Sequence, residues 1–289
     1  CPLVVACVGA LVLPLADFYP LVCMLLLFQG ISMGMLDTGG NLLMLDLWRS
    51  SPYQNSFEHA YHFFFGLGAA IAPVIVKCLL EFGLPALWAW HGVGALLAPS
   101  CVGLLALGCG PQPRANEEPS VAQEKLGRAS APRAVVLTGA FLFVYVGIEV
   151  SFGGYIDLFS VRWLGASKVQ GATLASIYWG ALCLGRAVAA FVTPFVHHAR
   201  YLAAQLALAM AAAAVLWVAS AVPEDAKPGT SLWHLGIVMP TAVFGFALAP
   251  LFPGAMLVVE ELLGGPLPPR DAGKIVGAAA AGEMALPLL

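Results

Sequence analysis

Long apolar stretches, separated by charges, proline or glycine, set the pattern of the whole chain. A bilayer core about 30 Å thick is crossed by about 20 apolar helical residues, and windows of that kind recur along the sequence. They cover 1–16, 18–47, 57–80, 84–109, 134–157, 169–195, 200–222, 232–258 and 275–289, and the first and last are too short to be complete. The pattern predicts an all-α membrane protein with about nine transmembrane helices.

One connection between the windows is longer and more polar than the others. Residues 111–133 carry several charges of both signs, with proline and serine between them. This composition predicts a linker between an N-terminal bundle at 1–110 and a C-terminal bundle at 134–289. When loops are assigned alternately to the two sides, the linker's side holds eight Lys and Arg against four. Four of the eight belong to the linker itself, and the excess places it in the cytoplasm.

A weak internal repeat relates the two predicted bundles. At a constant offset of 214, Gly40 matches Gly254, Asp46 matches Glu260, Gly68 matches Gly282 and Pro73 matches Pro287. Since the chain contains 31 glycines, chance matches are the alternative. Parallel duplicated halves joined by a linker are typical of transporters. The repeat therefore predicts a bundle of two parallel pseudo-repeats.

Composition narrows the class of protein further. Of the 289 residues, 60% are hydrophobic and 10% are charged, against about 25% charged in soluble domains. The net charge of −3 leaves no basic face for nucleic acid. The seven cysteines are scattered without a C-x-x-C pair, which predicts buried free thiols. Because the chain starts and ends within apolar sequence, we expect a fragment that lacks terminal helices.

Asp37 lies in the middle of an apolar window, where a charge costs about 2.5–3.5 kcal/mol. On a helix, Gly30, Gly34, Asp37 and Asn41 share one face. This face predicts an oxygen-liganded Na⁺ site at Asp37 or a sugar-hydroxyl site that includes Asn41. The alternative is a hydrogen bond between helices that only holds the bundle together.

Glu149 lies in the first helix after the linker, with Tyr145 one turn before it and Gly153 one turn after it. A carboxylate beside an aromatic ring suits a sugar, which offers hydroxyl groups and C–H faces. Trp179 is a further aromatic candidate for the sugar site. The alternative for Glu149 is a structural salt bridge.

Two other sets of charges are candidates for ion coupling and gating. Glu283 precedes Pro287, which frees backbone carbonyls in the same helix, so the carboxylate and a carbonyl are predicted to share a cation; packing or gating is the alternative. Arg186 needs a counter-charge inside its span. We expect it from Glu260 or Glu261, in a cytoplasmic gate whose counterpart is Asp46 with Arg49; the alternative is that Arg186 extends to the interface.

Two enzyme-like patterns carry little weight. Residues 30–34 match G-x-S-x-G around Ser32, but that motif requires a strand, a sharp turn and a helix, and here it lies in mid-span. Glu58, His59 and His62 suggest metal ligands, yet no third ligand pattern accompanies them. The sequence therefore favours a protein that is not an enzyme.

Several stretches resemble one family of transporters. They are GMLDTGGN at 34–41, HFFFGLGA at 62–69, YVGIEVSFG at 145–153, YWG at 178–180, GR at 185–186 and GEMALP at 282–287. The sequence resembles the major facilitator superfamily and, within it, the sodium-dependent glucose transporter 1 family. The resemblance implies that the nine windows correspond to the third to eleventh of twelve helices. Glu58 and His59 depart from the family's pattern and leave the substrate open.

What the resemblance implies is sodium-coupled uptake of glucose or a related hexose by alternating access. It places the protein in the plasma membrane, with the apical membrane as one option, as a monomer whose partners are a small sugar and the lipid bilayer. No cofactor is expected, and Na⁺ is the coupling ion. A sodium-independent carrier of sugar or another small solute is the alternative within the class. A non-transporting membrane receptor and an intramembrane hydrolase are the alternatives outside it.

Overall fold

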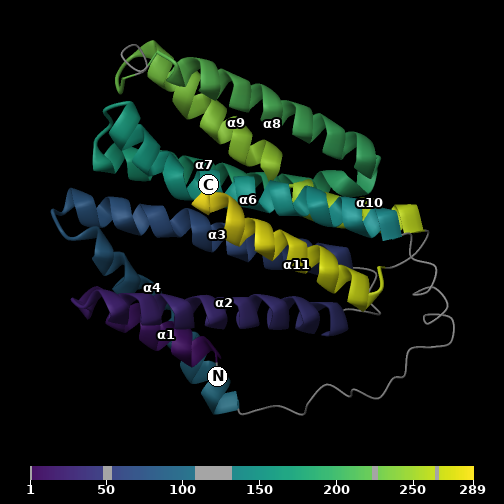
Figure 1. Ribbon diagram of the computed structural model, residues 1–289, viewed down its shortest axis with the longest axis horizontal. Helices are drawn as coiled ribbons and strands as arrows, with labels where there is room; N and C mark the ends of the chain where they lie inside the picture. The colour runs from purple at the N-terminus through teal and green to yellow at the C-terminus, as the bar shows by residue number, and fades with distance from the viewer. Residues whose placement is uncertain (1, 48–53, 108–131, 223–226, 264–266) are drawn as a thin grey trace. The chain divides into compact units, whose positions relative to one another are not determined.

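The computed structural model describes residues 2–47, 54–107, 132–222, 227–263 and 267–289 (Figure 1). The first of these helices are α1 Pro2–Val12, α2 Tyr19–Leu47, α3 Gln54–Glu81 and α4 Ala89–Leu107. The later ones are α6 Pro132–Trp163, α7 Lys168–Val192, α8 His198–Ser220, α9 Met239–Leu248, α10 Leu251–Leu263 and α11 Pro269–Ala285. Short 3₁₀ turns at 13–15, 86–88, 193–195 and 286–288 extend several of them.

Every apolar window of the sequence is mainly helical over the residues that the structure describes. Seven helical stretches within these ranges are long and apolar enough to cross a membrane. The two windows expected to be incomplete form the shorter helices, an apolar one at 2–15 and the 17-residue α11. The prediction of an all-α membrane protein is confirmed.

The window predicted at 232–258 is an interrupted span rather than one regular helix. It begins with a π-helix at Trp233–Val238, continues as α9, turns at Ala249 and Pro250, and resumes as α10. Proline lacks the N–H that a helix interior requires, and Pro240, Pro250 and Pro253 all fall within this span. The span therefore contains a helix break near its middle.

The offset of 214 residues also relates helix boundaries. Adding it to the first residues of α2 and α3, 19 and 54, gives 233 and 268. The π-helix that precedes α9 starts at 233, and α11 starts at 269. The agreement extends the repeat from single residues to whole elements, as two parallel pseudo-repeats require.

The chain divides into two compact units, Cys1–Tyr61 with Ile71–Ala115, and His62–Ala70 with Asn116–Leu289. In the first, α1 packs against α2 and α4 around Leu3, Cys7 and Cys101. The Cys7 and Cys101 thiols donate to backbone carbonyls at 3.4 Å. Cys183 of the second unit is also buried, but Cys23 and Cys78 are exposed. The prediction of buried thiols is therefore wrong for these two, because they lie on exposed faces of apolar helices. Cys1 and Cys109 lie outside the described residues.

In the second unit, α6 lies against α7, α10 and α11, while α9 contacts α7 and α8 (Figure 1). Glycines allow the close approach of α6 and α11. A Cβ added to Gly147 would reach to within 2.7 Å of the Gly282 carbonyl oxygen, and one on Gly282 would overlap the Phe143 carbonyl.

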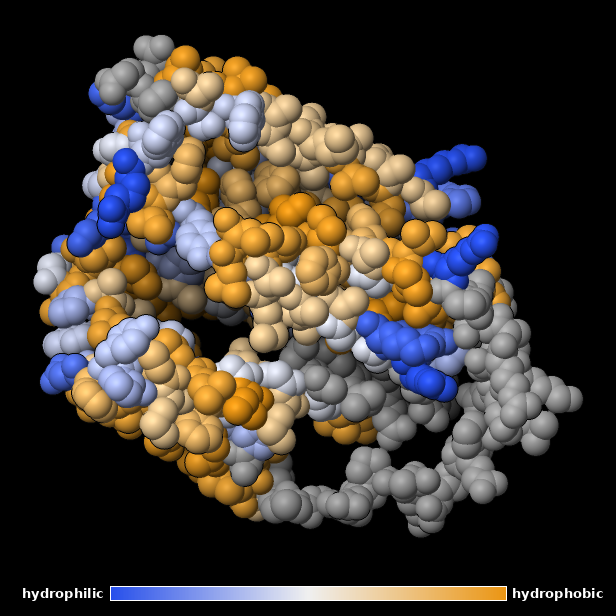
Figure 2. Space-filling view, viewed as in Figure 1, coloured by the Kyte–Doolittle hydropathy of each residue, from blue (hydrophilic) through white to orange (hydrophobic). Residues whose placement is uncertain are grey.

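Apolar side chains cover the visible sides of these helices, and polar ones gather at their ends (Figure 2). This is the surface of a bundle that spans a membrane.

The bundle boundaries predicted at 1–110 and 134–289 remain a prediction, and most of the predicted linker lies outside the described residues.

Candidate functional site

A buried ion pair joins α6 to α7 inside the second unit. Arg186 Nη2 lies 3.2 Å from Glu149 Oε1, and the two residues are only 6% and 4% exposed. Both belong to helices that are long and apolar enough to cross a membrane. A charge in such a place is costly unless it is paired, so the pair accounts for the position of both residues.

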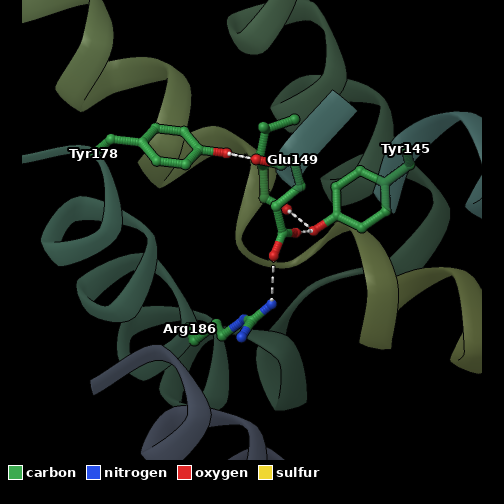
Figure 3. A network of polar contacts seen from close by, with 5 residues as sticks. Tyr145, Glu149, Tyr178 and Arg186 are labelled. Atoms are coloured by element: carbon green, nitrogen blue, oxygen red, sulfur yellow. Dashed lines mark hydrogen bonds and ion pairs between the residues drawn. The ribbon is translucent and has the colours of Figure 1, made fainter. Parts of the chain in front are cut away.

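Two tyrosines complete the site around Glu149 (Figure 3). The Tyr145 hydroxyl, one turn earlier on α6, donates to Glu149 Oε2 and also lies 3.0 Å from the Leu248 carbonyl at the end of α9. The Tyr178 hydroxyl of α7 donates to the backbone carbonyl of Glu149 at 3.0 Å. The polar cluster thus ties α6, α7 and α9 together.

Gly153 makes room for the α7 side of this cluster. A Cβ at that position would overlap the Trp179 indole and crowd the Tyr178 ring. The two rings meet edge to face at 5.1 Å, and Phe152 packs on Tyr178 at 5.0 Å and on Phe244 at 4.8 Å. The buried Tyr178 and Phe244 rings give the neighbouring polar groups a low-dielectric surrounding, which strengthens their electrostatic interactions.

The structure changes the partner that the sequence suggested for Arg186. Its counter-charge is Glu149, whereas Glu260 or Glu261 was expected. Glu260 Oε1 accepts a hydrogen bond from the backbone N–H of Leu267 at 3.1 Å, and Glu261 Oε1 lies 2.6 Å from His198 Nδ1. The prediction failed because it required only a carboxylate at the same end of the bundle, whereas Arg186 is buried against the neighbouring α6. Its burial also rules out extension to the interface.

The other predicted site residues lie apart from the polar cluster around Glu149, or their side chains lie outside the residues that the structure describes. Asp37, Asn41 and Asp46 lie on α2, but their side chains are outside the described residues, as is all of Arg49. Glu283 is exposed on α11. Trp179 packs beside Tyr178, and the candidate sugar residues Tyr145 and Glu149 lie in the cluster and contact each other directly.

Ser32 is buried within α2. The residues at 30–34 are helical throughout, without the strand and sharp turn that a nucleophile elbow needs.

Tyr178 is the site residue that sequence reasoning missed. Its position follows the buried face of α7, which repeats every three or four residues and includes Leu174, Tyr178, Leu182 and Gly185. This spacing marks a face directed into the bundle. It does not specify that the hydroxyl of Tyr178 meets a carbonyl on α6.

Together, the apolar helices, the interrupted span and the buried charge pair define a multi-pass α-helical membrane protein. Residues 1–287 match the model of the Major Facilitator Superfamily, and the chain belongs to this superfamily.

Curated relatives are similar over nearly the whole chain. Sodium-dependent glucose transporter 1A of Mus musculus is 28% identical across 99% of this chain and 71% of its own length. Sodium-dependent glucose transporter 1 of Homo sapiens is 27% identical across 97% of this chain and 57% of its own length. Bypass of stop codon protein 6 of Saccharomyces cerevisiae is 24% identical across 95% and 58%. The chain thus spans only part of the length of these relatives.

Proposed function

We propose that the intact protein is a secondary transporter in the plasma membrane, which takes up a hexose by alternating access and couples its movement to Na⁺. The buried network of Glu149, Arg186 and two tyrosines supports this proposal. Charged groups inside membrane helices are rare and mark pathways or moving contacts in transporters. The names of the mouse and human relatives, with the match to the superfamily, suggest the sugar and the ion.

In this proposal the substrate and the ion bind to different sets of residues. Asn41, Tyr145, Glu149 and Trp179 are the candidates for the sugar, and Asp37 and Glu283 are the candidates for Na⁺. Coupling requires that each ligand raises the affinity for the other by the same factor. The candidates for contacts that change between conformations are Asp46, Arg49, Arg186, Glu260 and Glu261. For Arg186, Glu260 and Glu261, the contacts in question are those with Glu149, Leu267 and His198.

Uptake of labelled glucose into proteoliposomes that contain the intact protein tests the proposal. We expect uptake to exceed that of empty liposomes and to rise severalfold when an inward Na⁺ gradient replaces a K⁺ gradient. Equal uptake in both gradients would indicate a sodium-independent carrier. Uptake no greater than in empty liposomes, for glucose and a panel of other hexoses, would contradict the sugar assignment.

Asp37→Asn tests whether Asp37 contributes to Na⁺ binding and not to sugar binding. The substitution removes the negative charge and keeps a similar shape, so Na⁺ should lose its strongest oxygen ligand while the sugar contacts stay. We expect the Na⁺ concentration for half-maximal uptake to rise about tenfold or more, as the loss of a charged interaction worth about 1.5–3 kcal/mol predicts. Asp17→Asn, at the exposed turn before α2, is the control and should leave the curve in place. An unchanged Na⁺ response in Asp37→Asn would remove this residue from the site.

A further inference from the structure

We propose that Tyr145 is a positioning residue that couples the Glu149–Arg186 ion pair to the break between α9 and α10. Its hydroxyl lies against two acceptors on different elements, Glu149 Oε2 on α6 and the Leu248 carbonyl oxygen at the end of α9. A phenol has one proton to donate. The hydroxyl therefore cannot satisfy both acceptors fully at the same time.

The second acceptor, the Leu248 carbonyl oxygen, lies next to the break between α9 and α10. Leu248 is the last residue of α9, and the chain turns at Ala249 and Pro250 before α10 begins. The Gly254 N–H donates to the Pro250 carbonyl at 2.9 Å across the start of α10. A hydroxyl held on Leu248 supports the end of α9, and a hydroxyl drawn to the carboxylate leaves it less supported.

Burial makes the choice of acceptor energetically significant. Tyr145, Glu149 and Leu248 are each 4% exposed, so water does not readily replace a lost partner. A hydrogen bond to a carboxylate is about twice as strong as one to a neutral acceptor. The charge on Glu149, which Arg186 stabilises, thus decides how the hydroxyl is shared. Changes at the ion pair are transmitted to the helix break through a single side chain.

Hydrogen–deuterium exchange of the amides at 249–256, measured on the intact protein in nanodiscs, tests this coupling. Tyr145→Phe keeps the ring, which stacks on Phe141, and removes the hydroxyl, so we expect exchange there to become about fivefold faster. Replacing the ion pair by Glu149→Met with Arg186→Met removes the competing acceptor. We expect this double variant to slow the exchange of the same amides by about twofold or more.

The combination of variants is the decisive measurement. In the Tyr145→Phe background, the two methionine substitutions should leave exchange at 249–256 unchanged, because the coupling group is missing. If they slow exchange equally with and without the hydroxyl, the coupling does not pass through Tyr145. Should the double variant be produced poorly, Glu149→Asp makes the same comparison, since it keeps the charge and withdraws the carboxylate.

Tyr178→Phe is the matched control. It removes a hydroxyl from the same cluster, but that hydroxyl donates to the backbone of Glu149, so exchange at 249–256 should stay as in the wild type. Acceleration as large as in Tyr145→Phe would indicate general loosening and overturn the proposal.

The consequence for transport rests on the proposed function, whereas the exchange measurement does not. If the break moves during transport, Tyr145→Phe should lower the maximum rate of hexose uptake at least threefold. A raised half-saturating hexose concentration with an unchanged maximum rate would make the hydroxyl a sugar ligand only and would overturn the positioning role. Absence of uptake in the wild type would remove the proposed function without affecting the exchange result.

Discussion

Arg186→Ala is expected to destabilise the intact protein by about 3–5 kcal/mol, because it leaves the Glu149 carboxylate buried without its counter-charge. Heating followed by fluorescence-detected size-exclusion chromatography in detergent measures the loss of folded protein. The midpoint temperature should fall by several degrees, and the yield should fall with it. Glu149→Gln is expected to act in the same direction, since it removes the carboxylate charge that lies 3.2 Å from the buried Arg186 guanidinium.

Removing both charges together should be much less harmful than removing either one. A buried ion pair replaced by apolar residues of similar volume is often neutral or stabilising, so Glu149→Met with Arg186→Met should recover most of the lost stability. Lys77→Ala is the control for a cation whose pair is exposed, with Glu81 at 3.9 Å, and should cost under about 1 kcal/mol. If Arg186→Ala is as mild as Lys77→Ala, the ion pair does not hold α6 to α7.

Gly282→Ala should destabilise the protein by about 1–3 kcal/mol. Its new methyl group would overlap the main-chain carbonyl of Phe143 on α6, and a backbone atom cannot move aside by changing a rotamer. The helices α6 and α11 must therefore separate, which weakens the core cluster to which Leu142 of α6 and Ile275 and Ala279 of α11 belong. The same thermal measurement in detergent reports the effect.

Two other glycines provide matched controls for this substitution. Gly277 lies on the same helix and Gly68 is the repeat-related counterpart of Gly282, and a Cβ at either position meets nothing within 4 Å. Alanine is the better helix former by about 1 kcal/mol, so Gly277→Ala and Gly68→Ala should be neutral or slightly stabilising. Equal losses at all three positions would show that the close approach of α6 and α11 is not the cause.

The sequence by itself determined the class of fold and the positions of the apolar helices along the chain. Apolar windows long enough to cross a bilayer have few alternatives to a helix, because a backbone in lipid must satisfy its hydrogen bonds internally. Every window is therefore mainly helical in the described residues, with the proline-rich 232–258 window interrupted near its middle. The unusual cost of a charge in such a window also singled out Glu149 and Arg186 as candidates before any contact was known.

Only the tertiary structure decided which of those charges meet. Position along the chain gives the depth of a residue in the membrane, so it placed Arg186 in one half of a span and offered Glu260 or Glu261 as partners at the same end. Pairing also depends on which helices are neighbours and on which way each face turns, and α7 turns Arg186 toward α6 and Glu149. Gly68 and Gly282 are equivalent in the sequence repeat, yet a neighbouring backbone constrains only Gly282, since packing density depends on contacts between distant segments.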